Sequence, residues 1–199
     1  MQRFDVINLL IKKYSYQRYL EIGVEGGVAF GKVKCAVKHG VDPYSVNATF
    51  RIPSDEFFAM IRHDVQYDIV FVDGLHTEDQ TQRDIENSVL HLSKNGVIVV
   101  HDCNPPTEWH QRSYEEAKLN NYRQWNGTTW RGFVNLRATR PDLEMCVVDT
   151  DWGCGIVRQS GKGQKRIDLP ENYSYSDFET HRKEWLNLIS TEEFLNFWL

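Results

Sequence analysis

The chain has 199 residues, of which 41% are hydrophobic and 13% aromatic, and its formal net charge at pH 7 is -5. This length fits one domain, residues 1–199, and the apolar content is sufficient for a packed core, which argues against disorder. The negative charge argues against nucleic acid or an anionic membrane as the main partner. No apolar run approaches the roughly 20 residues of a membrane span, and the N-terminus lacks the cleavage site of a signal peptide.

The four cysteines are scattered and include no CxxC pair. That pattern suits free thiols in a reducing compartment better than a disulfide framework or a zinc site. We therefore predict a cytoplasmic protein.

The first half of the chain alternates between apolar runs and helical patterns. Expected strands are RYLEIG (18–23), HGVD (39–42), ATFRI (48–52), YDIVFVD (67–73) and NGVIVVHD (95–102). Expected helices are 4–14, a short one within 26–37, one from 53–63 with Ser54 as its N-cap, and one within 78–92. Strands that alternate with helices imply a parallel α/β sheet.

The last third changes character. We expect a helix over 129–139, a pair of antiparallel strands within 143–160, and a basic loop at 161–166. A helical tail over about 172–199 carries an apolar face made of Phe178, Trp185, Leu188, Phe194, Phe197 and Trp198. The tail either docks on the domain, which is the simpler interpretation, or joins two subunits in a homo-oligomer. The fold class is thus α/β: a Rossmann-like, doubly wound, mostly parallel seven-stranded sheet with helices on both faces.

A glycine turn, EIGVEGG, follows the first expected strand. In doubly wound sheets such a turn lets a ligand approach closely. Glu25 stands where a dinucleotide site has its second glycine, and no Lys-Ser/Thr pair follows to form a P-loop. A ligand with positive charge fits better. S-adenosylmethionine is one, because Glu21 can hold its ammonium group and Asp42 can accept its ribose hydroxyls.

Two acids, Asp73 and Asp102, close neighbouring strands roughly 4.8 Å apart. Both carboxylates can therefore reach one hard cation such as Mg²⁺, which would orient an acceptor hydroxyl. His76 can then remove the hydroxyl proton as general base. The alternative interpretation is that such acids only bond to nearby helix ends and that His76 is a loop residue.

Several ordered motifs resemble the small class I S-adenosylmethionine-dependent methyltransferases. These motifs are YLEIGVEGG, VDPYS, SDEFF, YDIVFVDGLH and GVIVVHDCNP, and the resemblance covers residues 15–160. The subgroup that they resemble contains O-methyltransferases of sugars and natural products, some of them metal-dependent. The resemblance implies S-adenosylmethionine as cofactor and a small-molecule acceptor.

Carried over by position, the resemblance assigns cofactor contacts to residues in three motifs. The methionine-binding turn matches Glu21, Gly23 and Gly27, and the ribose-binding acid matches Asp42. Asp73 also lies beside the cofactor in this resemblance. The adenine contact falls on Ser54 or Asp55, which are equally good helix-cap residues.

For the metal, the resemblance implies that Asp73 is a ligand and His76 the base. Relatives place two polar ligands at the end of the next strand, and catechol-type enzymes use Asp-Asn. Here the sequence is HDCN: the pair is His101-Asp102 or, in the catechol-type comparison, Asp102-Cys103. Asn104 supplies an amide oxygen one position later. Asp73, Asp102 and Asn104 are thus the predicted metal ligands.

Two other classes of function stay open. One is a non-catalytic binding or assembly protein that keeps the methyltransferase fold. The other is a nicotinamide-dependent oxidoreductase, which the missing GxGxxG motif disfavours. Acceptor selectivity is expected in the loops around 104–130 and 149–155, where Trp109 and His110 are candidates to line the acceptor pocket.

Overall fold

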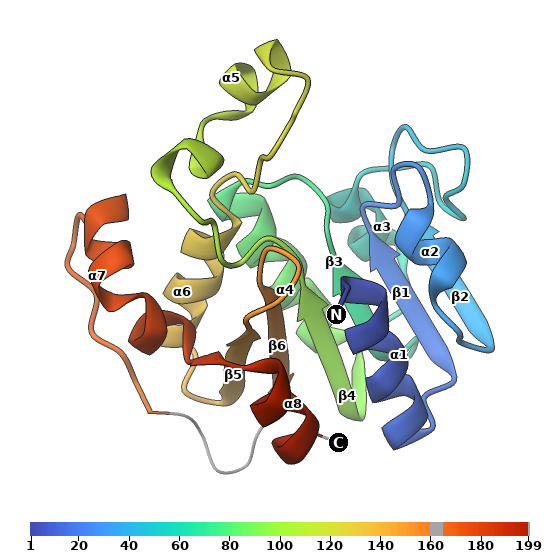
Figure 1. Cartoon of the computed structure of the whole chain (residues 1–199). Helices are drawn as coiled ribbons and strands as arrows, with labels where there is room; N and C mark the ends of the chain where they lie inside the picture. Colours follow the sequence, from blue (N-terminus) through green and yellow to red (C-terminus); the bar gives the residue numbers. More distant parts are fainter. Residues whose placement is uncertain (160–164, 199) are drawn as a thin grey trace.

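A computed structural model describes residues 1–159 and 165–198 of the chain. It shows a seven-stranded sheet with strand order β2-β1-β3-β4-β6-β5-β7 and helices on both faces (Figure 1). The strands are β1 (Arg18–Ile22), β2 (Val37–Val41), β3 (Tyr67–Val72), β4 (Leu92–Val100), β5 (Leu143–Val148), β6 (Cys154–Gln159) and β7 (Leu188–Ile189). The helices are α1 (Arg3–Tyr14), α2 (Val28–Lys32), α3 (Ser54–Met60), α4 (Glu78–Leu90), η1 (Glu108–Gln111), α5 (Tyr114–Leu119), α6 (Thr129–Thr139), α7 (Tyr175–Leu186) and α8 (Thr191–Phe197).

Strands β2, β1, β3 and β4 are parallel, whereas β6 runs antiparallel to both β4 and β5. This mixed sheet confirms the predicted fold class. Parallel strands bring their carboxyl ends to one edge of the sheet, and α5 stands above that edge (Figure 1).

The core lies in two layers, one on each face of the sheet. Along β3, Val70 and Val72 belong to the layer under α3, α4, α6 and α7, while Ile69 and Phe71 belong to the layer under α1, α2 and α8. A strand covered on both faces needs apolar side chains at every position. This is why β3 reads as a continuous apolar run.

The predicted strand at 48–52 is wrong. Only Phe50 forms a bridge there, with Val41 of β2. The run ends at once because Pro53 has no N–H to donate and α3 begins at the next residue. Pro53, not Ser54, occupies the N-cap position of α3. The seventh strand of the sheet is instead β7, which pairs with β5.

The C-terminal tail is two helices rather than one. Asn187 adopts a left-handed conformation, with φ of 46°, and ends α7. Strand β7 then follows the sheet edge, so that α7 packs Phe178 on one face while α8 packs Phe194 on the other. Both side chains are completely buried, whereas Phe197 is 78% exposed. The predicted docking of the tail on the domain is confirmed, except for Phe197.

Other sequence-based predictions concern cysteines, membranes and loops. All four cysteines are free thiols, as expected. None of the helices in the described parts of the chain is both long and apolar enough to cross a membrane. The predicted loop at 161–166 falls largely on 160–164, which lie outside the described residues.

Candidate active site

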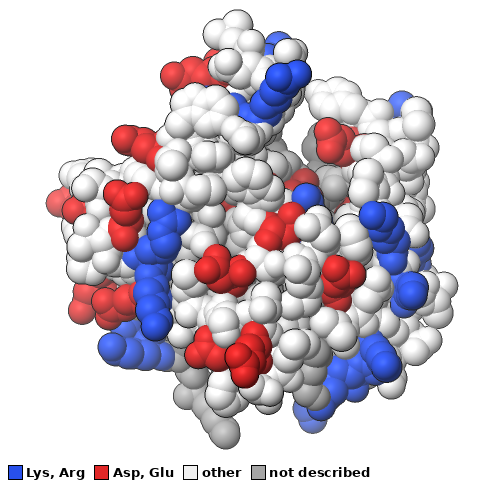
Figure 2. Space-filling model, in the orientation of Figure 1, with Lys and Arg blue, Asp and Glu red and all other residues white. Residues whose placement is uncertain are grey.

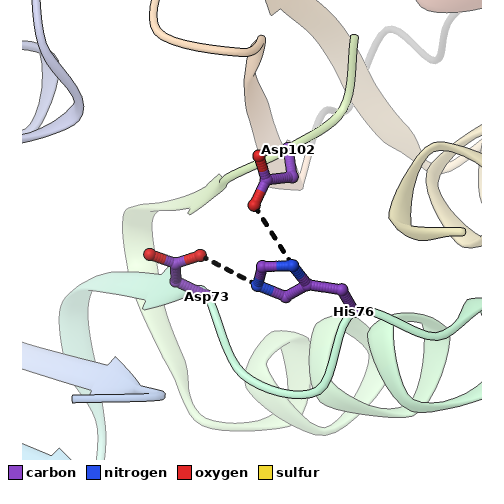
Figure 3. A group of neighbouring side chains, drawn as sticks. All are labelled: Asp73, His76 and Asp102. Atoms are coloured by element: carbon purple, nitrogen blue, oxygen red, sulfur yellow. Dashed lines mark ion pairs between the residues drawn. The ribbon is translucent and has the colours of Figure 1, made fainter. Parts of the chain in front are cut away.

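The carboxyl ends of β3 and β4 bring three predicted site residues together (Figure 3). The imidazole of His76 lies between two carboxylates: its Nε2 is 3.4 Å from Oδ1 of Asp73, and its Nδ1 is 3.4 Å from Oδ2 of Asp102. Asp73 follows β3 directly, and Asp102 comes two residues after the end of β4. The loop after β3 then returns His76 to the same edge.

Asp102 is held in an unusual backbone conformation. Its φ of 60° lies in the left-handed region, which aspartate tolerates better than most residues. Asn126 donates from Nδ2 to Oδ1 of Asp102 at 2.8 Å, and the ring of Trp125 stacks on His76 at 4.9 Å between centroids. The segment that follows α5 therefore helps to orient both Asp102 and His76.

Three further residues, Arg3, His101 and Asp151, complete the cluster. The sequence offered His101 as the partner of Asp102 in the HDCN motif, but no role was predicted for Arg3 or Asp151. Nη1 of Arg3, in the first turn of α1, donates to Oδ2 of Asp73 at 3.0 Å. Nδ1 of His101 lies 3.0 Å from Oδ2 of Asp102 and 3.3 Å from Oδ1 of Asp73. Asp151, in the turn between β5 and β6, accepts a hydrogen bond from Nε of Arg3 at 3.0 Å. The connection between β5 and β6, DTDWG at 149–153, is rich in Asp and Gly, which is a weak signal for Asp151.

These contacts shift the pKa values of the cluster. Burial by itself would raise the pKa of Asp73, but the charge and hydrogen bond of His101, joined by His76, hold it well below its usual range. Burial would lower the pKa of both histidines, but Asp102 and Asp73 raise it, most strongly at His101. Burial would likewise raise the pKa of Asp151, but the nearby ring of His101 and the hydrogen bonds from Arg3 bring it to about 2. Asp73 and Asp151 are therefore ionised at neutral pH.

The cluster has side chains of the kinds that bind metal ions, but its carboxylate oxygens already have protein partners. Asp73, His76 and Asp102 offer ligand atoms that lie within 4.8 Å of one another. Each of the four carboxylate oxygens, however, has a protein nitrogen within 3.4 Å: Arg3 or the histidines at Asp73, and Asn126 or the histidines at Asp102. A hard cation needs oxygen lone pairs that face it. The residues as arranged therefore do not fit a divalent ion.

Asn104, the third predicted metal ligand, has other partners. Its Nδ2 donates to Oδ1 of Asp149 at 3.0 Å, and its Oδ1 accepts from Nη1 of Arg182 at 2.5 Å. The side chain thus joins the β5–β6 turn to α7. Its amide oxygen accepts a hydrogen bond from Arg182 of the tail, and its role as a metal ligand stays a prediction.

The glycine turn after β1 lies against the end of β3. Gly23 has φ of +87°, and a Cβ added there would lie 2.0 Å from the carbonyl oxygen of Asp73. Gly27, with φ of +74°, is the N-cap of α2. Beside this turn, the carboxylate of Glu21 is only 1% exposed and accepts a hydrogen bond from the hydroxyl of Tyr19. Burial raises the pKa of Glu21 to about 8.

The raised pKa of Glu21 gives a prediction for cofactor binding. If Glu21 pairs with the ammonium group of S-adenosylmethionine, binding requires the ionised carboxylate and releases a proton below pH 8. Affinity is then expected to rise by up to about tenfold per pH unit toward pH 8 and to level off above it. Calorimetry in buffers of different ionisation enthalpy measures the protons released. Glu21→Gln should abolish the release, and wild-type binding without proton release would contradict the pairing.

Asp42, the predicted ribose-binding acid, organises its own loop. One carboxylate oxygen accepts from the backbone N–H of Glu25 at 2.8 Å, and the other accepts from Tyr44 and Ser45, each at 2.8 Å. Burial would raise the pKa of Asp42, but these hydrogen bonds lower it overall. Asp42 is therefore ionised and lies next to the glycine turn. Its role in binding the ribose hydroxyls stays a prediction.

Ser54 and Asp55, the predicted adenine contacts, connect α3 with α4. Nε2 of Gln80 donates to Oγ of Ser54 at 3.2 Å and to Oδ1 of Asp55 at 3.1 Å. Gln80 also donates to Asp84, a carboxylate that is only 1% exposed. Adenine contact by either residue stays a prediction.

The buried Asp84 should make stability depend on pH. Burial raises its pKa to about 6, with hydrogen bonds from Ser54 and Gln80 opposing the rise. A carboxyl group with a raised folded-state pKa destabilises the protein increasingly as pH rises from its unfolded value through the folded one. Roughly two pKa units correspond to about 3 kcal/mol. Asp84→Asn is therefore expected to increase the free energy of unfolding by about 1–3 kcal/mol at pH 8, and by much less at pH 4.

Urea denaturation at the two pH values measures this difference. Asp79→Asn, at an exposed position of the same helix, is the matched control and should show no such gain. A gain at Asp84 of equal size at both pH values would contradict burial of the charge as its cause.

Comparison with known proteins agrees with this architecture. Residues 20–103, from β1 to the end of the Asp73–Asp102 region, match the family described as a methyltransferase domain. Over this stretch, which is less than half of the chain, the sequence is similar to a methyltransferase domain. This match confirms the predicted likeness to methyltransferases, and the solved structures that follow confirm the likeness to O-methyltransferases. No protein with a curated description matches the chain.

Solved structures of methyltransferases share the fold at low sequence identity. A protein from Klebsiella pneumoniae, assigned as an O-methyltransferase, has 12% identity, a TM-score of 0.59 and 80% coverage of both chains. The O-methyltransferase TomG from Streptomyces achromogenes, in complex with S-adenosylmethionine, has 15% identity, a TM-score of 0.56 and 80% coverage of both chains. The O-methyltransferase from Bacillus cereus, in complex with S-adenosylhomocysteine, has 15% identity, a TM-score of 0.54, and covers 78% of this chain and 79% of its own.

Proposed function

We propose that this chain transfers the methyl group of S-adenosylmethionine to an oxygen atom of a small polar acceptor, such as a sugar or a related metabolite. The observation that carries the proposal is the position of His76 between Asp73 and Asp102, at the same sheet edge as the Gly23 turn. TomG and the enzyme from Bacillus cereus, which share the fold, are O-methyltransferases by description.

His76 has the surroundings that a general base needs. When the acceptor hydroxyl meets the sulfonium methyl group, its proton passes to the imidazole and its oxygen forms the new bond to the methyl carbon. The bond between that carbon and sulfur breaks, which leaves a methyl ether and neutral S-adenosylhomocysteine. Asp73 and Asp102 stabilise the protonated imidazole that results. The methyl group is already activated, so alignment supplies much of the remaining acceleration.

The acceptor would lie in the hollow above the strand ends. Figure 2 shows the surface hollowed between the part that carries α5 and the part that carries α2 and α3, with acidic and basic atoms close together in it. Two of the loops expected to select the acceptor meet at this edge, since the ring of His110 lies 5.4 Å from those of both Trp109 and Trp152. Such rings suit the apolar face of a sugar or a planar metabolite.

Mg²⁺ assistance stays a prediction from the sequence. Asp73 and Asp102 would be the ligands, and the nitrogens now beside their oxygens would have to withdraw. The mechanism described above includes no step that depends on such an ion.

The proposal is tested by incubating the protein with methyl-labelled S-adenosylmethionine and a panel of sugars, nucleosides and phenols. Label in an ether-linked product, together with S-adenosylhomocysteine, is the expected result. Absence of cofactor binding at about 1 mM in calorimetry would contradict it, because that concentration is the upper end of usual KM values. Binding without transfer to any acceptor would favour a non-catalytic protein that keeps the fold.

A further inference from the structure

Arg3 reaches the acidic cluster from an element remote in sequence. It lies in the first turn of α1, which packs Val6 and Leu10, both completely buried, against the sheet. Nη1 of Arg3 is 3.0 Å from Oδ2 of Asp73, and its Nε is 3.0 Å from Oδ2 of Asp151. The side chain is only 29% exposed. Packing of α1 therefore delivers a guanidinium group to the end of β3.

The turn between β5 and β6 clamps this part of the helix. The backbone N–H of Arg3 donates to Oδ2 of Asp151 at 2.8 Å, and the hydroxyl of Thr150 donates to the carbonyl of Met1 at 2.5 Å. Asp151, Trp152 and Gly153 all have positive φ values, of 43°, 66° and 89°. Two non-glycine residues in this conformation cost free energy. This strained conformation of the turn directs Asp151 toward Arg3.

The charges of the cluster require a cation at this place. Asp73, Asp102 and Asp151 are three acids whose side chains are at most 15% exposed, and all three interact electrostatically with Arg3. Carboxylates so close together and so shielded from water repel one another unless positive charge lies among them. His76 and His101 supply part of that charge. A divalent ion can supply more, and so can a guanidinium group, whose planar fork suits carboxylate partners.

We propose that Arg3 is a positioning residue that takes the place of a divalent ion at the acidic cluster, so that methyl transfer by this chain needs no metal. Arg3 binds Oδ2 of Asp73 and leaves Oδ1 of the same carboxylate facing Nε2 of His76. It acts through Asp73, which it holds in the orientation that supports the base. The statement about methyl transfer rests on the proposed function. The statement that Arg3 occupies the place of a metal ion can be tested without it.

The first test measures Mn²⁺ binding by electron paramagnetic resonance, in the absence of cofactor and acceptor. Wild type is expected to bind Mn²⁺ only weakly at the cluster. Arg3→Met keeps the apolar stem but removes the charge, and should bind Mn²⁺ at least about tenfold more tightly. Arg3→Lys keeps the charge and should stay close to wild type. Tight Mn²⁺ binding by wild type, or equal affinity of the Met and Lys variants, would overturn the proposal.

The second test measures methyl transfer with and without a chelator. Wild type should be unaffected by the chelator. Arg3→Met should be slower, and added Mg²⁺ or Mn²⁺ should restore part of its rate, whereas a purely structural loss would not respond to metal. If Arg3→Met does not fold, as judged by thermal melting, the wild-type measurements still decide. If the chelator abolishes methyl transfer by wild type, the proposal is overturned. If the protein transfers no methyl group at all, the proposed function fails, and the Mn²⁺ measurement alone decides whether Arg3 replaces a metal ion.

Discussion

Replacement of His76 by glutamine is expected to lower the rate of methyl transfer by about 10²–10⁴-fold, the usual contribution of a general base. Glutamine has a similar size but cannot take up a proton. Because His76 contacts Asp73 and Asp102 and not the glycine turn, affinity for S-adenosylmethionine should be unchanged. Steady-state kinetics and calorimetry measure the two quantities separately.

The matched control is His63→Gln, at an exposed position away from the strand ends, which should transfer at the wild-type rate. The pH profile gives a further check. Burial would lower the pKa of His76, but Asp102 and Asp73 raise it above the ordinary value. Only the neutral imidazole accepts a proton, so the wild-type rate should rise with pH through and beyond the usual histidine range. Transfer by His76→Gln at nearly the wild-type rate would show that another group removes the proton.

Gly23→Ala should destabilise the protein and abolish cofactor binding. At φ of +87° an alanine is strained, which costs about 1–2 kcal/mol. Its Cβ would also lie 2.0 Å from the carbonyl oxygen of Asp73 and 2.7 Å from Cα of Gly74. Both contacts are with backbone, which yields less easily than a side chain, and overpacking adds about 1–3 kcal/mol. We expect a total loss of about 2–5 kcal/mol in the free energy of unfolding, measured in urea.

Gly26→Ala is the control in the same turn. No atom lies within 4 Å of a Cβ added at Gly26, and its φ lies outside the left-handed region. This variant should differ from wild type by less than about 1 kcal/mol. Similar unfolding curves for the Gly23 and Gly26 variants would contradict the close approach of the turn to β3.

Local patterns in the sequence were sufficient to predict most of the fold. Continuous apolar runs identified β3 and β4, and the spacing of apolar residues identified α6 with its observed limits, Thr129–Thr139. The carboxyl ends of parallel strands meet at one edge of the sheet, whatever the conformation of the connecting loops. For that reason, the proximity of Asp73, His76 and Asp102 could also be predicted from order along the chain.

Errors arose where local pattern and tertiary packing differ. The run at 48–52 has strand-forming residues, but it forms only one bridge before Pro53 and α3. The tail has a helical pattern throughout, yet Asn187 interrupts it so that the chain can pass the sheet edge at β7. Packing also decides the partners of Asn104: Arg182, 78 residues away, donates to its amide oxygen, a contact that no local pattern predicts.

The sequence by itself determined the sheet, the glycine turn and the two acids that close β3 and β4, because these depend on side-chain periodicity and on short-range backbone requirements. Only the tertiary structure brought a guanidinium group to those acids, beside His76 and His101. Arg3 and Asp151 are 148 residues apart, and Arg3 and Asp73 are 70 residues apart. Their contacts exist because apolar packing places α1 over the sheet and a turn with positive φ values directs Asp151 toward it. No local sequence pattern predicts either arrangement. The contact between Arg3 and Asp73 therefore could not be predicted from the sequence.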